Sequence, residues 1–158
     1  MSISMTAGEI LQFAMRMEEN GERFYREAAN NSSDSKVKEL FNHLASEETV
    51  HNRSFEELFS KAEIFESPES YPGEYLAYFY NYIDNKVFFT DENKASLHES
   101  FDVLKAMDFA MQRELDSVLF YQELKAFVPV ADNKTIEAII DEERRHFTQL
   151  CEAKNILK

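Results

Sequence analysis

Two short stretches of the sequence contain a glutamate followed three residues later by a histidine: Glu48 with His51, and Glu143 with His146. On an α-helix, side chains three residues apart lie about 60° apart around the axis and about 4.5 Å along it, so both can reach one bound ion. Carboxylate oxygens and imidazole nitrogens are ordinary ligands of divalent metals. One such pair would be weak evidence in a glutamate-rich chain, but two pairs indicate a metal site built on helices.

The two pairs belong to an internal repeat with a shift of 95 or 96 residues. In each half, the Glu-x-x-His pair follows a lone glutamate, Glu18 or Glu114, by about 30 residues. That separation suits an antiparallel helical hairpin, which would bring the lone glutamate and the pair to the same height. The sequence therefore predicts two hairpins that face each other. The other matching segments are residues 13–18 with 109–114, and Phe24-Tyr25 with Phe120-Tyr121.

The two halves together direct four carboxylates and two imidazoles towards one point. Four buried carboxylates without cations would repel one another and lose their hydration. Two divalent ions would balance four negative charges, so the pattern predicts a dimetal site. An oxygen-rich donor set without thiolate suits iron or manganese, and zinc could also bind but would be redox-silent. The six candidate ligands are Glu18, Glu48, His51, Glu114, Glu143 and His146.

Several residues lie close in sequence to the candidate ligands. Tyr25 and Tyr121 follow their lone glutamates by two turns, and each hydroxyl could donate a hydrogen bond to a ligand carboxylate across the bundle, or simply fill the core. Glu47 and Glu142 could orient the imidazole of the opposite half, or lie at the surface. Small residues beside the lone glutamates could leave room for metals and a small oxidant, or allow close helix packing; these are Ala14, Gly21, Ala110 and Ser117.

The composition limits the classes of function. The chain has 158 residues, of which 44% are hydrophobic, and is expected to form one domain, 1–158, with a substantial core. Its net charge of −13 disfavours nucleic acid and anionic membranes as partners. There is no apolar segment of 18 residues and no signal sequence, so a cytoplasmic protein is expected. Cys151 is the single cysteine and is predicted to be a small core residue, whereas His43 and His98 are predicted to lie at the surface.

Helix start and stop signals divide the chain into a hairpin at 6–63, a crossover at 64–98 and a second hairpin at 99–157. A capping box at Thr6 and Glu9 opens the first helix. The crossover contains an aromatic run, for which we expect a short helix near 74–83 and packing across the bundle or at a dimer contact. Residues 30–33 are expected to end the first helix and to cap the second, which should run over 34–62. The third helix should start near Ser100 and end before Pro129, and Asp132 or Asn133 should cap the fourth.

With these motifs, the chain resembles the rubrerythrin and bacterioferritin branch of the ferritin-like superfamily. The resemblance implies an all-α fold, a ferritin-like antiparallel four-helix bundle of two duplicated hairpins with a long crossover between the second and third helices. It also implies a non-haem centre of two iron ions that reacts with hydrogen peroxide or O2. Rubrerythrins have an additional glutamate where this chain has Ser117. The residues that carry the resemblance are Glu18 with Tyr25, Glu48 with His51, Glu114 with Tyr121, and Glu143 with His146.

These observations favour an iron-dependent redox enzyme that acts on H2O2 or O2 in oxidative-stress defence. Rubrerythrins usually carry a rubredoxin-like iron domain, which one cysteine cannot build, so an external electron donor, possibly rubredoxin-like, is expected. A homodimer is also expected. One alternative is a ferroxidase that stores or handles iron, which would require a closed cage. Another is a structural bundle whose metal site is vestigial, in which case chelation would leave stability unchanged.

Overall fold

Four long helices make up most of the part of the chain that a computed structural model describes, residues 6–64, 77, 81 and 101–158. They form an antiparallel bundle, and none of the described residues is in a strand. No helix among these residues combines enough length with enough apolar character to cross a membrane. The helices are α1 (Ala7–Asn31), α2 (Ser35–Ser60), α5 (Val103–Leu124) and α6 (Asn133–Leu157), with short 3-10 turns η1 (Ala62–Ile64), η2 (Lys125–Phe127) and η3 (Val130–Asp132).

The first two helices begin at side-chain caps. The predicted capping box of α1 is confirmed: the Glu9 backbone N–H donates to Thr6 Oγ1 over 3.2 Å, and the Thr6 N–H donates to Glu9 Oε2 over 2.8 Å. The cap of α2 differs from the prediction, which used residues 30–33. Asp34 caps α2, because its carboxylate accepts hydrogen bonds from two backbone N–H groups of the first turn.

The second hairpin begins and ends close to the predicted positions. Helix α5 starts after the cap residue Asp102 and gives way to η2 before Pro129. Asp132 occupies the cap position of α6 as predicted, but its side chain makes no capping hydrogen bond. The preceding turn η3 already holds Asp132 in a helical conformation, with φ −92° and ψ −10°, so its carboxylate is not placed over the first turn.

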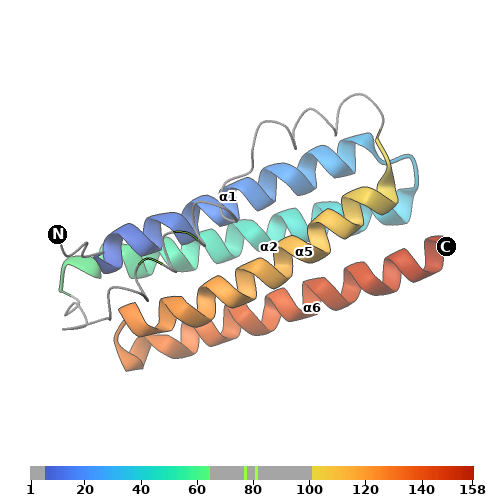
Figure 1. Cartoon of the computed structure of the whole chain (residues 1–158). Helices are drawn as coiled ribbons and strands as arrows, with labels where there is room; N and C mark the ends of the chain where they lie inside the picture. Colours follow the sequence, from blue (N-terminus) through green and yellow to red (C-terminus); the bar gives the residue numbers. More distant parts are fainter. Residues whose placement is uncertain (1–5, 65–76, 78–80, 82–100) are drawn as a thin grey trace.

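The order of the helices confirms the predicted four-helix topology. Figure 1 shows α1 and α2 as one antiparallel hairpin and α5 and α6 as the other. Helix α2 ends at the opposite end of the bundle from the start of α5. The predicted crossover 64–98 and its aromatic run lie outside the described residues, apart from residues 64, 77 and 81. The last two were predicted to lie in a short helix and are helical.

The core consists of two apolar clusters separated by a polar layer. The first, which we call the Phe55 cluster, fills the end of the bundle where α1 and α6 begin and includes Ile10, Leu11, Phe55, Phe120 and Ile136. The second, the Phe41 cluster, fills the other end and includes Ala28, Phe41, Leu44, Met107 and Leu150. On α1, Met17 belongs to the Phe55 cluster and Phe24 to the Phe41 cluster, and Glu18 lies between them. Each of the other three helices also passes from one apolar cluster through the polar layer to the other cluster. The helices thus place all the candidate ligands at the middle of the bundle.

Candidate metal centre

The structure brings the six candidate ligands together in this polar layer, one lone glutamate or one Glu-x-x-His pair from each helix. Each of the six residues is buried, with an exposed fraction of 3% or less. They form two overlapping groups, within each of which the potential ligand atoms all lie within 4.8 Å of one another. The groups are Glu18, Glu48, His51 and Glu143, and Glu48, Glu114, Glu143 and His146.

Both histidines direct Nδ1 towards the interior of the layer. His51 Nδ1 lies 3.3 Å from Glu143 Oε1 and 3.5 Å from Glu18 Oε2. His146 Nδ1 lies 3.0 Å from Glu143 Oε2. The two rings are nearly parallel, with centroids 5.5 Å apart. Glu143 therefore has one oxygen beside each histidine, so it would be a ligand available to both ions if two were held here.

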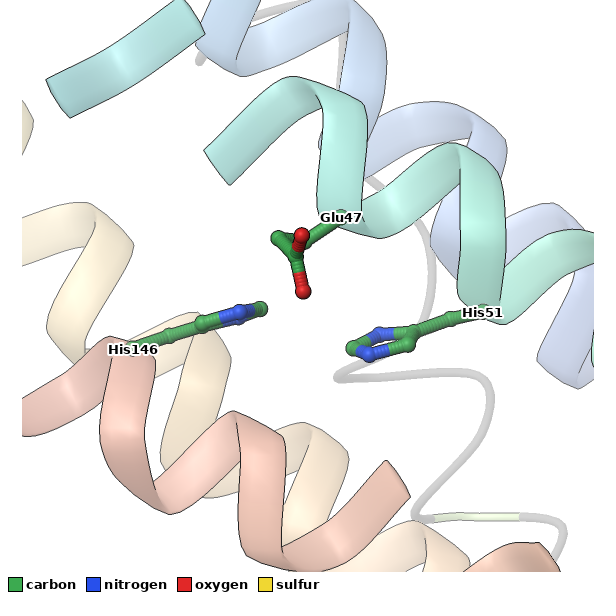
Figure 2. A group of neighbouring side chains, drawn as sticks. All are labelled: Glu47, His51 and His146. Carbon is green, nitrogen blue, oxygen red and sulfur yellow. The ribbon is translucent and has the colours of Figure 1, made fainter. Parts of the chain in front are cut away.

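Two further glutamates, Glu47 and Glu142, directly precede candidate ligands and lie near the outer side of the histidines. His51 Nε2 and Glu142 Oε2 are hydrogen-bonded at 2.6 Å, so the predicted orientation of an imidazole by the opposite hairpin is present here. Such a contact fixes the ring and its tautomer. Glu47 points into the space between His51 and His146 (Figure 2), within 4.8 Å of a nitrogen of each. It makes no hydrogen bond to either ring, so the two halves differ at this point.

The two tyrosines make the predicted hydrogen bonds across the bundle. The Tyr25 hydroxyl on α1 donates to Glu114 Oε1 on α5, and the Tyr121 hydroxyl on α5 donates to Glu18 Oε1 on α1. Burial, together with the neighbouring carboxylates, raises the pKa of both hydroxyls well above the usual value, so they remain protonated donors. Each bond holds the outer oxygen of a glutamate and leaves the inner oxygen directed at the centre.

A buried arginine that the sequence analysis did not identify also lies in this layer. Arg113 Nη2 donates to the backbone oxygen of Met17 over 2.8 Å and to Glu48 Oε2 over 3.0 Å. Its Nη1 lies 3.7 Å from Glu114 Oε1. The guanidinium occupies the space over Gly21, where an added Cβ would lie 1.8 Å from Nη2. The interpretation of Gly21 as room for metals or an oxidant is therefore wrong, because the arginine fills that room.

Without metal, protons add to the positive charge that Arg113 contributes to the layer. Burial alone would lower the pKa of His146, but the nearby carboxylates of Glu114, Glu143 and Glu48 outweigh it and raise the pKa to about 12. The pKa of His51 is raised in the same way by Glu143 and Glu18. Burial, reinforced by repulsion from Glu143 and Glu48, raises the pKa of Glu114 to about 8. The site therefore retains protons where cations would otherwise compensate the carboxylates.

The inward atoms fit a pair of divalent metal ions. Buried polar atoms are almost always hydrogen-bonded, and a group of exceptions calls for a ligand. Hard oxygen donors with two imidazole nitrogens suit iron or manganese. Five inward atoms of the candidate ligands are buried without a hydrogen-bond partner: Glu18 Oε2, Glu48 Oε1, His51 Nδ1, Glu114 Oε2 and Glu143 Oε1.

The remaining sequence-predicted residues lie outside the ligand set. Ser117, which stands where rubrerythrins have a further glutamate, is buried, and its hydroxyl has no hydrogen-bond partner. His43 is exposed as predicted, and His98 lies outside the described residues. Cys151 is half-buried at the edge of the bundle, 4.0 Å from the Met111 sulfur, so it is not the fully enclosed core residue we expected.

Comparison with known proteins agrees with this geometry. The family model described as Rubrerythrin matches residues 9–154. The chain belongs to the rubrerythrin family. A solved structure from Thermotoga maritima, assigned as a ferritin-like diiron-carboxylate protein, shares 27% sequence identity, with 98% of each chain covered and a TM-score of 0.74. The comparison with curated proteins found no match. Rubrerythrin-family membership and the buried cluster together support a dimetal carboxylate centre of the di-iron type.

Proposed function

We propose that this rubrerythrin-family protein is a non-haem di-iron oxidoreductase that reduces hydrogen peroxide or O2 with electrons from an external donor. The observation that carries the proposal is the pair of buried ligand groups that share Glu48 and Glu143. Two overlapping groups can hold two ions side by side, whereas a single-metal site would need only one of them. A pair of iron ions supplies the electrons for O2 or peroxide chemistry.

The residues of the chain have separate roles in this proposal. Glu18 and His51 would hold one ion, and Glu114 and His146 the other. Tyr25 and Tyr121 keep the outer oxygens of the two lone glutamates occupied, so their inner oxygens stay directed at the ions. The apolar clusters above and below the layer exclude water, which protects the centre from side reactions.

The source of electrons is a second part of the proposal. The 158 residues given contain one cysteine, so they do not include a four-cysteine iron site. We therefore propose that a rubredoxin-like protein delivers the electrons. A reductant assay with and without such a protein would test this part by itself.

The central test is anaerobic loading with Fe(II), followed by rapid mixing with H2O2 or O2 and detection of the charge-transfer absorption of the oxidised iron pair. We expect two irons per chain and faster oxidation by peroxide. Glu143→Ala should abolish the rapid phase, because it removes a ligand shared by both groups. Glu152→Ala, which changes an exposed glutamate of the same helix, should leave it intact. If iron beyond two per chain continues to be oxidised, the iron-storage alternative replaces this proposal, and if no iron binds, the proposal is wrong.

A further inference from the structure

The buried arginine breaks the twofold repeat of the centre. The 96-residue shift that relates the two hairpins pairs Arg113 with Met17 and Gly21 with Ser117. The second hairpin thus contributes a guanidinium to the layer, and the first contributes only a thioether side chain at the equivalent place. Gly21 accommodates the guanidinium, because any larger residue would overlap it. The asymmetry is therefore built from two positions on facing helices.

The arginine makes the two shared carboxylates different. Both oxygens of Glu143 face a histidine, at 3.0 Å and 3.3 Å from the two Nδ1 atoms. Glu48 has one oxygen facing the centre, 3.6 Å from His146 Nδ1, while its other oxygen accepts a hydrogen bond from Arg113. Two residues that occupy equivalent places in the repeat thus present different numbers of oxygens to bound metal.

The arginine also changes the charge balance of the layer. Four carboxylates and one guanidinium carry a net charge of minus three once the histidines are neutral. The first divalent ion leaves a net charge of minus one, so the second ion meets a weaker attraction than it would without the arginine. The guanidinium contacts Glu48 and Glu114, both of which belong to the group around His146.

We propose that Arg113 is a positioning residue that makes the two metal positions unequal, by holding one oxygen of Glu48 and by placing a permanent positive charge beside the Glu114–His146 position. This inference rests on the dimetal site of the proposed function. It predicts that two ions bind in two distinguishable steps, and that the second step is the weaker one because of Arg113.

The test is a titration of metal-free protein with Mn(II), followed by calorimetry and by the EPR signal of the free ion. The wild-type protein should bind two ions in two steps. Arg113→Met, which installs the residue of the equivalent position, should tighten the second step by about tenfold or more. Arg113→Lys keeps the charge and should restore most of the difference between the steps. Arg144→Met removes the same charge from an exposed side chain and should change nothing.

A second variant keeps the test decisive if Arg113→Met does not fold. Gly21→Ala changes neither a candidate ligand nor Arg113 itself. Its added Cβ would overlap the guanidinium and force that group away from Glu48. Alanine also favours the helix over glycine, so this variant should remain folded. It should alter the second step in the same direction. If both folded variants bind Mn(II) in two steps with wild-type affinities, the inference about Arg113 is overturned and the dimetal proposal stands. If no protein, including the wild type, binds Mn(II), the inference and the dimetal proposal are both overturned.

Discussion

At the scale of single residues, the tyrosines act on the opposite hairpin. Tyr121 on α5 holds Glu18 on α1, and Tyr25 on α1 holds Glu114 on α5. Each bond therefore joins the two hairpins and sets the orientation of a candidate ligand at the same time.

Tyr121→Phe should lower the affinity for Mn(II) by about tenfold, because Glu18 loses the donor that fixes its outer oxygen. Calorimetric titration would measure the change. Phe55→Leu is the control, since it alters the packing against the Tyr121 ring, 4.9 Å away between centroids, without removing a hydrogen bond. The control should lower the melting temperature but leave the affinity close to the wild-type value. An unchanged affinity in Tyr121→Phe would show that the hydroxyl only fills space.

Glu142→Gln tests the contact on the outer side of His51. The substitution removes the negative charge that faces Nε2 at 2.6 Å, so we expect about a tenfold loss of Mn(II) affinity. Glu47→Gln is a matched control from the equivalent place in the other hairpin, where no hydrogen bond to a histidine is made. It should have the smaller effect. Equal effects of the two substitutions would contradict the asymmetry seen in the structure.

Most of the residues in the centre could be predicted from the sequence, because their spacing alone places them on one helix face and at one height. Arg113 could not be predicted in this way. It directly precedes Glu114, so on a helical projection it lies about 100° away from the ligand face. Its burial depends on the missing side chain of Gly21 on a different helix, which is a tertiary relation. A glycine in the middle of a helix without a turn was the one available signal.

At the scale of helices, the caps differ in what they contribute. The Asp34 carboxylate accepts two backbone hydrogen bonds at the start of α2, at 2.8 and 3.0 Å. The Asp132 carboxylate accepts none at the start of α6. The same residue type therefore has different energetic weight at the two positions.

Asp34→Ala should lower the free energy of unfolding by about 1 kcal/mol, because two N–H groups of the first turn lose their acceptor. Chemical denaturation of the metal-free protein would measure this change. Asp132→Ala provides the comparison and should be nearly neutral. A larger loss in Asp132→Ala than in Asp34→Ala would contradict this assignment of the caps.

The helices themselves were predictable because apolar residues recur on one face of each segment. Thr6 and Glu9 defined the first boundary correctly, since a capping box is a local signal. The start of α2 was predicted to within one residue, but its cap was misplaced within a run of polar residues, all of which are good helix caps. The turn η3 was not predicted, because a 3-10 turn between a proline and a helix has no distinct hydrophobic period.

At the scale of the whole molecule, the buried layer links stability to pH. In the folded metal-free protein the pKa of His146 is about 12 and that of Glu114 about 8, against ordinary values of 6.5 and 4.5. Both groups bind their protons more tightly in the folded chain, so their contribution to stability is complete at low pH. That contribution is lost as the pH rises through the pKa values that the two groups have in the folded protein. The pKa of Glu143 is lowered, mainly by His146 and His51 against the effect of burial, so its contribution is lost instead as the pH falls below about 4.5.

The metal-free protein should therefore become less stable between about pH 6 and pH 9. Its free energy of unfolding should fall by about 1.4 kcal/mol per pH unit for each proton that is bound in the folded state but not in the unfolded state. Thermal unfolding in EDTA, followed by circular dichroism, would measure the trend. Protein loaded with Mn(II) should melt at a higher temperature and should not show the decline, because metal binding requires deprotonated ligands and stabilises the folded state. A melting temperature that rises with pH in EDTA would contradict this account, and identical curves with and without Mn(II) would favour a vestigial site.

The two apolar clusters also determine from which direction the centre can be reached. Glu18 is 11 residues from the start of α1 and 13 from its end, which is about 17 to 20 Å along the axis in either direction. The Phe55 and Phe41 clusters fill both of these paths. By contrast, Glu142 is 31% exposed while it is hydrogen-bonded to His51, so the seam between α2 and α6 brings solvent within one side chain of the ligands. Under the proposed function, we therefore expect an electron-delivering protein to dock along the flank of the bundle, because one bound at either tip would be separated from the centre by an apolar cluster.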